Sequence, residues 1–445
     1  MTAAAQSNLP AEAEEDFRPV LPGSTVGLIG GGQLGRMFAI AARRMGYRVH
    51  TLEPSPDSPA GQISDREIEA RYDDAEKLEE FARAVDVITF EFENIPSASL
   101  DRVARVCPVR PRPKVLHICQ NRAREKEFLA ANVFPVADYR VVASAAEAAA
   151  EAAAMGFPCV MKTADFGYDG KGESKLGSAA DASDAWTALA APRAVLEEWV
   201  DFRCEISVVC ARDASGRVEC FPPSENLHRN HILHRSVVPA RIDPSIARQA
   251  ELLAVRIARA LDVVGVLAVE FFVRRDGSLL VNELAPRPHN SGHFSFDACA
   301  TSQFEQQLRA VCALPLGSPR LLTPVVMVNL LGDAWADGEP DWPALLSDPD
   351  VKLHLYGKSE VRPGRKMGHF CVLKPTIEEA AAAADAAETR LFGRAASDDR
   401  AYLPWVWNRK STPTRSAKRS CSSASSLPSP CLPPLPWPRC RSIAS

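Results

Sequence analysis

Residues 269–284, VEFFVRRDGSLLVNEL, contain the pattern that decides the fold. Two apolar runs flank Asp276-Gly277, a dipeptide that favours a two-residue β-hairpin turn. If those two residues form the tip, the numbers of paired residues sum to 553, and Glu270 faces Glu283. The register therefore predicts two carboxylates as direct cross-strand neighbours, with Cβ atoms about 4.5–5.5 Å apart.

Two facing carboxylates repel each other unless a cation lies between them. Mg²⁺ is commonly bound through one or two carboxylates together with substrate phosphates. The neighbours Ala268, Val269, Phe271 and Leu284 are apolar, which disfavours the alternative of a solvated hairpin end. We therefore expect Glu270 and Glu283 to hold Mg²⁺.

The segment after the hairpin, LAPRPHNSGH at 284–293, is expected to be a rigid loop because of its two prolines. It carries Arg287, His289 and Asn290 directly away from the predicted metal. A histidine in isolation is more often structural, but this cluster beside a metal indicates a site that binds oxyanions.

A glycine-rich stretch, FGYDGKGE at 166–173, follows a predicted strand that ends in Lys162. Three glycines allow a row of exposed amides, and the lysines can meet phosphate oxygens. The stretch lacks the P-loop pattern, so we interpret it as a flexible phosphate cover. An ordinary glycine-rich hairpin is the alternative.

A second glycine motif, GGGQLG at 30–35, lies between a predicted strand and a predicted helix, with Glu53 eighteen residues further on. This is the pattern of a dinucleotide-binding turn, in which Glu53 would bind a ribose hydroxyl. Three interpretations stay open on these residues: a nicotinamide or flavin cofactor, another phosphorylated ligand, or a purely structural turn.

Periodicity, turn signals and changes in composition divide the chain into five segments. They are a disordered arm at 1–24, a first domain at 25–115, a second at 116–315, a small C-terminal cap domain at 316–408, and a low-complexity basic tail at 409–445. Strand–helix–strand alternation in the first domain predicts a parallel sheet, with ligands at the carboxyl ends of its strands. The Ser/Pro/Arg-rich tail is expected to be disordered.

The composition is that of a globular protein, since 46% of the 445 residues are apolar and 24% are charged. A formal charge of −4 shows no basic bias, so we expect no nucleic-acid partner. The most apolar stretch, 263–273, is too short for a membrane span, and residues 1–24 lack the features of a targeting signal. Twelve cysteines without a Cys-x-x-Cys pair indicate reduced thiols and a cytoplasmic protein.

Five motifs together carry a family resemblance: GGGQLGRM at 30–37, TFEFENIP at 89–96, FGYDGKGE at 166–173, NELAPRPHNSGH at 282–293 and VRPGRKMGH at 361–369. From about residue 25 to 392 the chain resembles the ATP-grasp superfamily, and within it the ATP-dependent carboxylases of bacterial purine synthesis. The resemblance ends near Trp407. A disordered extension and a change of reading frame would both fit the remainder.

The resemblance implies an α/β and α+β multidomain fold with a Rossmann-like substrate-binding domain, an ATP-grasp domain and a small C-terminal domain. It implies that the amine of 5-aminoimidazole ribonucleotide is carboxylated by bicarbonate and ATP through carboxyphosphate, with Mg²⁺ bound and ADP and phosphate released. A homodimer without a nucleic-acid or membrane partner is expected.

The resemblance also assigns residues to roles. The implied ATP contacts are Arg122, Lys162, Gly167, Tyr168, Asp169, Gly170, Lys171, Gly172, Glu173, Glu197, Glu198, Trp199, Val200, Glu205, His228, Asn282 and Glu283. The implied ribonucleotide contacts are Gln33, Leu34, Glu91, Asn94, Lys358, Arg365 and Lys366. Arg287, His289 and Asn290 would bind the carbonate oxygens, and Asp169 would assist deprotonation of the amine.

Two other classes are weighed against this one. Another ATP-grasp ligase, such as a formate-dependent transformylase or a biotin carboxylase, would share the carboxylate pair but need not carry HNSGH or RPGRK. A nicotinamide-dependent oxidoreductase would explain the glycine turn at 30–35 and leave the glutamate hairpin unused.

Overall fold

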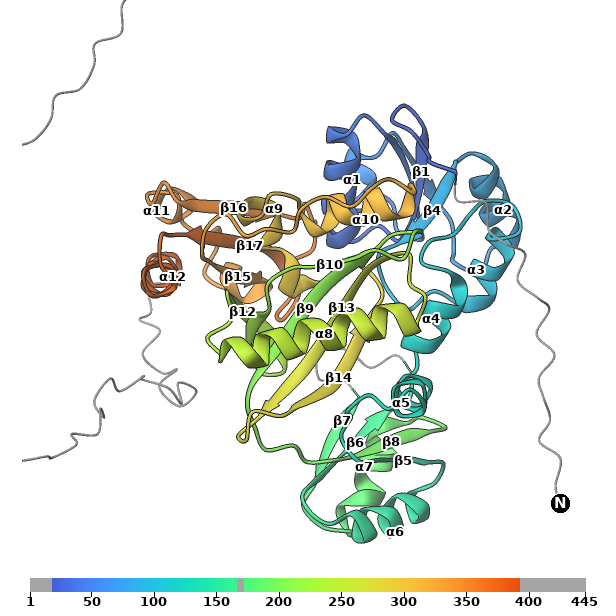
Figure 1. Ribbon diagram of the computed structural model, residues 1–445, viewed down its shortest axis with the longest axis vertical. Helices are drawn as coiled ribbons and strands as arrows, with labels where there is room; N and C mark the ends of the chain where they lie inside the picture. Colours follow the sequence, from blue (N-terminus) through green and yellow to red (C-terminus); the bar gives the residue numbers. More distant parts are fainter. Residues whose placement is uncertain (1–17, 166–171, 393–445) are drawn as a thin grey trace, which may run out of the picture. The chain divides into compact units, whose positions relative to one another are not determined.

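The computed structural model describes residues 18–165 and 172–392, and the structural statements below concern these residues. A parallel sheet of order β3-β2-β1-β4 begins the chain (Figure 1). Its strands are β1 (Thr25–Ile29), β2 (Arg48–Glu53), β3 (Arg66–Glu69) and β4 (Val87–Phe90). The helical segments around it are α1 (Gln33–Arg44), η1 (Gly61–Ile63), α2 (Ala75–Arg83) and α3 (Ser97–Val103).

Strand β1 is buried along its whole length because both faces of this sheet are covered. Val26 and Leu28 pack in the cluster that contains α1, and Ile29 packs in the cluster that contains α2 and α3. The predicted parallel sheet is confirmed. The arm predicted at 1–24 is bound at its end, where the Tyr47 hydroxyl donates to the Val20 carbonyl at 2.6 Å; its residues 1–17 lie outside the described residues.

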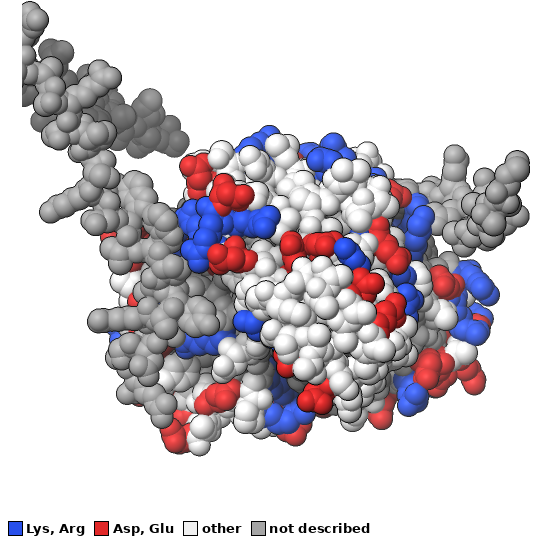
Figure 2. Space-filling view, turned by 90° about the horizontal axis from the view of Figure 1, so that it is seen from below, with Lys and Arg blue, Asp and Glu red and all other residues white. Residues whose placement is uncertain are grey.

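A smaller lobe follows two connecting helices, α4 (Pro113–Cys119) and α5 (Arg122–Ala131). Its antiparallel sheet has the order β5-β8-β6-β7. The elements are β5 (Tyr139–Val142), α6 (Ala145–Met155), β6 (Cys159–Thr163), β7 (Glu173–Leu176), α7 (Asp181–Leu189) and β8 (Ala194–Glu198). Helix α6 is mostly alanine, and Figure 2 shows this side of the molecule as a largely uncharged surface bordered by charges of both signs.

The third sheet has nine strands, of which eight follow the order β14-β13-β9-β11-β12-β15-β17-β16, while β10 pairs with β9. Its strands are β9 (Phe202–Arg212), β10 (Val218–Cys220), β11 (Ser224–Arg229), β12 (Ile232–Val238), β13 (Gly265–Arg274), β14 (Leu279–Ala285), β15 (Val325–Leu331), β16 (Val351–Leu355) and β17 (Lys366–Leu373). The other elements are α8 (Pro244–Ala260), η2 (Asn290–Gly292), α9 (Ser295–Ala298), α10 (Gln303–Val311), η3 (Gly332–Trp335), α11 (Trp342–Leu345) and α12 (Ile377–Phe392).

Helix α8 covers one face of this sheet (Figure 1). Ile246, Ala250, Ala254 and Ile257 recur at helical spacing and are all buried against β9 and β13. The carboxylate of Asp243 caps the first turn by accepting from the Ser245 amide at 2.8 Å. The rigid sheet beneath α8 carries the glutamate hairpin.

The described part of the segment predicted as a small C-terminal cap domain, residues 316–392, shares its sheet with the second domain. Its strand β15 pairs with β12, and β17 and β16 continue the same sheet. The prediction missed this because antiparallel pairing between strands some ninety residues apart leaves no local signal. The boundaries at 115 and 315 stay predictions, since the described residues belong to one compact unit.

The hairpin register was predicted correctly at the carboxylates and wrongly at the turn. The turn has three residues, closed by the Arg274 amide donating to the Ser278 carbonyl at 2.9 Å, with Gly277 at φ +86°. The numbers of paired residues near the tip therefore sum to 552, one less than predicted. The extra residue Asn282 forms a bulge in β14, and beyond it the numbers again sum to 553, so Glu270 does pair with Glu283.

No helix within 18–165 or 172–392 is long and apolar enough to cross a membrane. The nine cysteines in these ranges are free thiols.

We predict that Glu388→Ala destabilises the protein by about 3 kcal/mol, because it removes one partner of a buried ion pair. Glu388 on α12 contacts Arg235 and lies 2.9 Å from His234 Nε2, and so ties α12 to β12. Denaturant unfolding measures the change. Glu378→Ala, an exposed change on the same helix, is the control and should stay within about 0.5 kcal/mol of the parent. Equal effects of the two variants would contradict the prediction.

Candidate active site

A cavity of about 480 Å³ is lined by residues of α1 and the segment after β4, by β6 and β7 of the smaller lobe, and by strands of the third sheet. Sixteen of the sequence-predicted site residues line it: Gln33, Leu34, Glu91, Asn94, Arg122, Lys162, Glu173, Glu205, His228, Glu270, Asn282, Glu283, Arg287, His289, Asn290 and Lys366. Its wall does not include Gly172, Glu197, Glu198, Trp199, Val200, Lys358 or Arg365. Gly167, Tyr168, Asp169, Gly170 and Lys171 lie outside the described residues.

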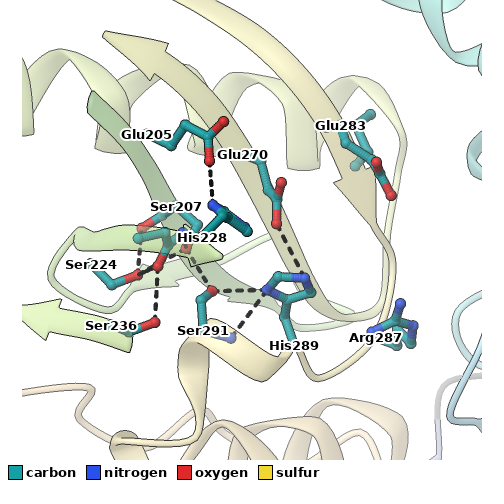
Figure 3. A network of polar contacts seen from close by, with 12 residues as sticks. Glu205, Ser207, Ser224, His228, Ser236, Glu270, Glu283, Arg287, His289 and Ser291 are labelled. Carbon is teal, nitrogen blue, oxygen red and sulfur yellow. Dashed lines mark hydrogen bonds and ion pairs between the residues drawn. The ribbon is translucent and has the colours of Figure 1, made fainter. Parts of the chain in front are cut away.

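The paired glutamates face the cavity from adjacent strands (Figure 3). Burial, and then the charge of Glu283, raises the pKa of Glu270 to about 7. Glu270 lies 3.3 Å from His289 Nε2, and Glu283 lies 3.3 Å from the Arg122 guanidinium. These contacts offset only part of the repulsion between the two carboxylates.

The donor set at the hairpin fits Mg²⁺. Both glutamates supply hard oxygen ligands, and Asn282 Oδ1 between them in the chain is buried without a hydrogen-bond partner. In the described part of the chain, no group of three or more His, Cys, Asp or Glu side chains is gathered for a metal. A metal held here would therefore take its remaining ligands from water or substrate phosphates, as Mg²⁺ commonly does.

The loop after β14 is fixed by its own contacts. The Gln303 side chain accepts from the His289 amide at 2.8 Å and donates to the His289 carbonyl at 2.7 Å. The Glu93 carboxylate accepts from Arg287 Nη2 at 2.7 and 2.8 Å. The amide group of Asn290 is buried with neither polar atom paired. The loop thus presents a cation, an imidazole and an unsatisfied amide to the cavity.

Charged pairs surround the region predicted to bind ATP. Burial would raise the pKa of Glu197, but Lys126 at 3.4 Å and Lys162 at 3.3 Å hold that pKa at about 2. Burial would lower the pKa of His228, but Glu205 at 2.5 Å raises it. Lys162 is therefore oriented by a carboxylate that stays ionised.

Three amides of the glycine turn at 30–35 donate to carboxylates of the protein itself. Gly31 donates to Glu53 at 2.9 Å, and Gly35 donates to Glu91 at 2.7 Å. Gly32 also donates to Glu91. Glu53 accepts in addition from the Tyr72 hydroxyl at 2.5 Å. Of the three interpretations that the sequence leaves open for this turn, these bonds favour a structural role for Gly31, Gly32 and Gly35, with Glu53 and Glu91 as their acceptors.

The basic turn before β17 is only partly in the site. Lys366 lines the cavity, whereas Lys358 donates to the Lys366 carbonyl at 2.7 Å and Arg365 donates to the Glu360 carbonyl at 2.8 Å. Burial, and then the charge of Arg365, lowers the pKa of Lys358 to about 8. Lys358 supports the strand that carries Lys366.

Sequence reasoning missed two buried charges on α5, Glu125 and Lys126. Glu125 lines the cavity and accepts from the Leu284 amide at 2.9 Å. Burial, and then Glu283, raises the pKa of Glu125 to about 8. The signal was available, since the two residues follow Arg122 at helical spacings of three and four and so share its face.

Three family models match consecutive parts of the chain. Residues 24–120 match the ribonucleotide synthetase preATP-grasp domain, residues 127–304 match the ATP-grasp domain, and residues 325–383 match the phosphoribosylaminoimidazole carboxylase C-terminal domain. The fold and the site thus define an ATP-grasp enzyme.

Relatives of known name narrow the class. The chain is 46% identical over 360 residues to the N5-carboxyaminoimidazole ribonucleotide synthase of Bacillus subtilis, which covers 81% of this chain and 94% of that protein. A solved N5-carboxyaminoimidazole ribonucleotide synthetase in complex with ADP superimposes with a TM-score of 0.79 at 44% identity, over 83% of this chain and 98% of that one. The Aspergillus clavatus enzyme in complex with ADP and 5-aminoimidazole ribonucleotide gives a TM-score of 0.76 at 32% identity. This match covers 82% of this chain and 98% of that one.

The chain belongs to the family of N5-carboxyaminoimidazole ribonucleotide synthases. It is an ATP-dependent ligase that carboxylates 5-aminoimidazole ribonucleotide in purine biosynthesis. The resemblance drawn from the motifs is confirmed, and the nicotinamide-dependent alternative is set aside.

We predict that Glu270→Gln stabilises the ligand-free protein at pH 8 by at least about 1 kcal/mol. The folded pKa of about 7 exceeds the ordinary value of 4.5, so the carboxyl contributes stability that falls as pH rises from about 4.5 to about 7. Thermal unfolding should show the gain at pH 8 and almost none at pH 5. The exposed change Glu360→Gln is the control, and a gain that is equal at both pH values would contradict the prediction.

Proposed function

We propose that Mg²⁺ and ATP bind at the hairpin side of the cavity, formed by the third sheet and the smaller lobe. We propose that the ribonucleotide binds at the first-sheet side, formed by α1 and the segment after β4. The support is that Glu270, Glu283 and Lys162 line the cavity from the former elements, and Gln33 and Asn94 line it from the latter. When bound, Mg²⁺ neutralises phosphate charge. Phosphoryl transfer needs positioning and charge stabilisation more than covalent help from the protein.

The nucleotide is bound by cations and by the lobe that carries β6 and β7. Arg122 and Lys162 meet its phosphates, while Glu205 and His228 form a hydrogen-bonded pair beside it. Glu197 contributes through Lys162 rather than from the wall. The remaining proposed ATP contacts are Gly167, Tyr168, Asp169, Gly170, Lys171, Gly172, Glu173, Glu198, Trp199, Val200, Asn282 and Glu283.

Bicarbonate occupies the loop after β14. Arg287, His289 and Asn290 bind its oxygens, and the buried, unpaired amide of Asn290 supports this because such a group is costly without a partner. Attack of bicarbonate on the γ-phosphate gives carboxyphosphate and ADP. Loss of Glu93 as the partner of Arg287 would leave that guanidinium free to point elsewhere.

The amine of 5-aminoimidazole ribonucleotide then takes up the carboxyl group of carboxyphosphate, and phosphate leaves. Gln33, Leu34, Glu91, Asn94 and Lys366 grip the ribonucleotide, with Lys358 and Arg365 behind Lys366 at the 5′-phosphate. Asp169 assists deprotonation of the amine. The protein works as a homodimer in the cytoplasm, as the family resemblance implies, and light scattering after gel filtration tests the dimer.

The unsatisfied Asn290 amide beside Arg287 and His289 is the observation that carries this assignment. The test is phosphate release with ATP, bicarbonate and 5-aminoimidazole ribonucleotide, with each omitted in turn. Release should require the ribonucleotide. Release that is triggered instead by biotin or by glycinamide ribonucleotide would overturn the assignment.

We predict that Arg287→Lys lowers kcat by about 100-fold, because a single ammonium cannot replace the guanidinium both at Glu93 and at the carbonate. The KM for ATP should change little, since ATP lies on the hairpin side. Steady-state kinetics of ADP formation measure both constants. Arg320→Lys, an exposed change, serves as the control, and an unchanged kcat in Arg287→Lys would count against the role.

A further inference from the structure

A row of buried polar side chains lies behind His289, on the side of the ring away from Glu270 (Figure 3). We call it the hydroxyl row, and it consists of Ser291, Ser207 and Asn226. Ser291 follows His289 in the loop, Ser207 comes from β9, and Asn226 comes from β11. All three are buried within the large sheet and its loop, where an unpaired polar group is costly. Their hydrogen bonds therefore have to be consistent with one another.

One contact fixes which ring nitrogen of His289 carries hydrogen. The backbone N–H of Ser291 points at His289 Nδ1 at 3.3 Å. A backbone N–H can only donate, so Nδ1 is the accepting nitrogen of the neutral ring. The hydrogen is then on Nε2, which lies 3.3 Å from Glu270 Oε1.

The hydroxyl row enforces the same choice. Ser291 Oγ lies 2.8 Å from Nδ1 and must donate to it, so it accepts from Ser207 Oγ at 2.6 Å. Ser207 Oγ in turn accepts from Asn226 Nδ2 at 3.0 Å, and an amide nitrogen can only donate. Asn226 Oδ1 accepts from Ser236 Oγ at 2.9 Å, so the second polar atom of this amide is also paired.

The donor–acceptor direction of the hydrogen bonds along the row determines whether His289 Nε2 carries a hydrogen where it faces the cavity. With the Ser291 backbone N–H setting the His289 end, the hydroxyls of Ser291 and Ser207 both donate toward His289, and Nε2–H faces the site. Bicarbonate and carboxyphosphate present only acceptor oxygens at the atoms that carry negative charge. An unprotonated Nε2 would place its lone pair against the lone pairs of these oxygens and repel them, whereas Nε2–H donates a hydrogen bond to them.

We propose that Asn226, Ser207 and Ser291 are positioning residues that hold His289 as an Nε2–H donor to the anionic oxygens of the carboxyl-transfer reaction. This proposal rests on the proposed role of His289 in that reaction. Ser224 provides the comparison, because its hydroxyl contacts Ser207 Oγ at 2.8 Å and Asn226 Oδ1 at 3.3 Å from beside the row.

The first experiment reads the ring directly in the full-length parent protein. Two-bond ¹H–¹⁵N spectra of ¹⁵N-histidine-labelled protein distinguish protonated from bare ring nitrogens, and His289→Gln assigns the signals. Hydrogen on Nε2 is expected. Hydrogen on Nδ1 would overturn the proposal, and this measurement requires no variant of the row to fold.

The second experiment separates positioning from packing. Ser207→Ala and Ser291→Ala should each lower kcat by about 10- to 100-fold, as loss of an orienting partner commonly does, with the KM for ATP within about twofold. Ser224→Ala removes a buried hydroxyl from the same cluster and should stay within about threefold of the parent. Equal losses in Ser207→Ala and Ser224→Ala would show a packing role and overturn the proposal.

Failure of the underlying assignment gives a different result. If His289→Gln turns over at the parent rate, His289 has no role in the reaction, whatever the spectrum shows. A slow His289→Gln together with hydrogen on Nδ1 overturns the positioning proposal alone.

Discussion

Repulsion between Glu270 and Glu283 is the constraint around which the site is arranged. The hairpin brings the two carboxylates together in a buried setting, where like charges interact strongly. Arg122 lies against one glutamate and His289 against the other. The charge balance of the ligand-free protein thus involves α5 and the loop after β14, the same elements that face the substrates.

Much of this site could be predicted from the sequence, because its decisive feature is local. The paired residues of a hairpin follow from the position of its turn, and the loop that completes the site comes directly after the hairpin in the chain. Even so, the pairing of Glu270 with Glu283 was predicted with a wrong turn. The three-residue turn and the bulge at Asn282 each shift the register by one residue, and the two shifts cancel. Neither is visible in residue types alone, since Asp-Gly suits both turns.

The rest depended on contacts between distant parts of the chain. The glycine turn has the residues of a phosphate cradle, yet Glu91, some sixty positions away, accepts its amide hydrogens. The strands after residue 325 join the central sheet through pairs that no local pattern encodes. Glu125 and Lys126 were missed although their helical spacing from Arg122 is visible in the sequence, because the burial of that helix face depends on contacts with β14 and β8.

The continuity of the large sheet has a mechanical consequence. Glu270 on β13 and Lys366 on β17 belong to one hydrogen-bonded sheet, so continuous backbone pairing sets the distance between these two cavity-lining side chains. Lys162 belongs to a different sheet, and within the described residues the pairing between the smaller lobe and the large sheet is an isolated bridge of Val136 with Val281. A displacement of the lobe of β5–β8 would therefore change the distance from Lys162 to Glu270, whereas the distance from Glu270 to Lys366 would stay set by the large sheet.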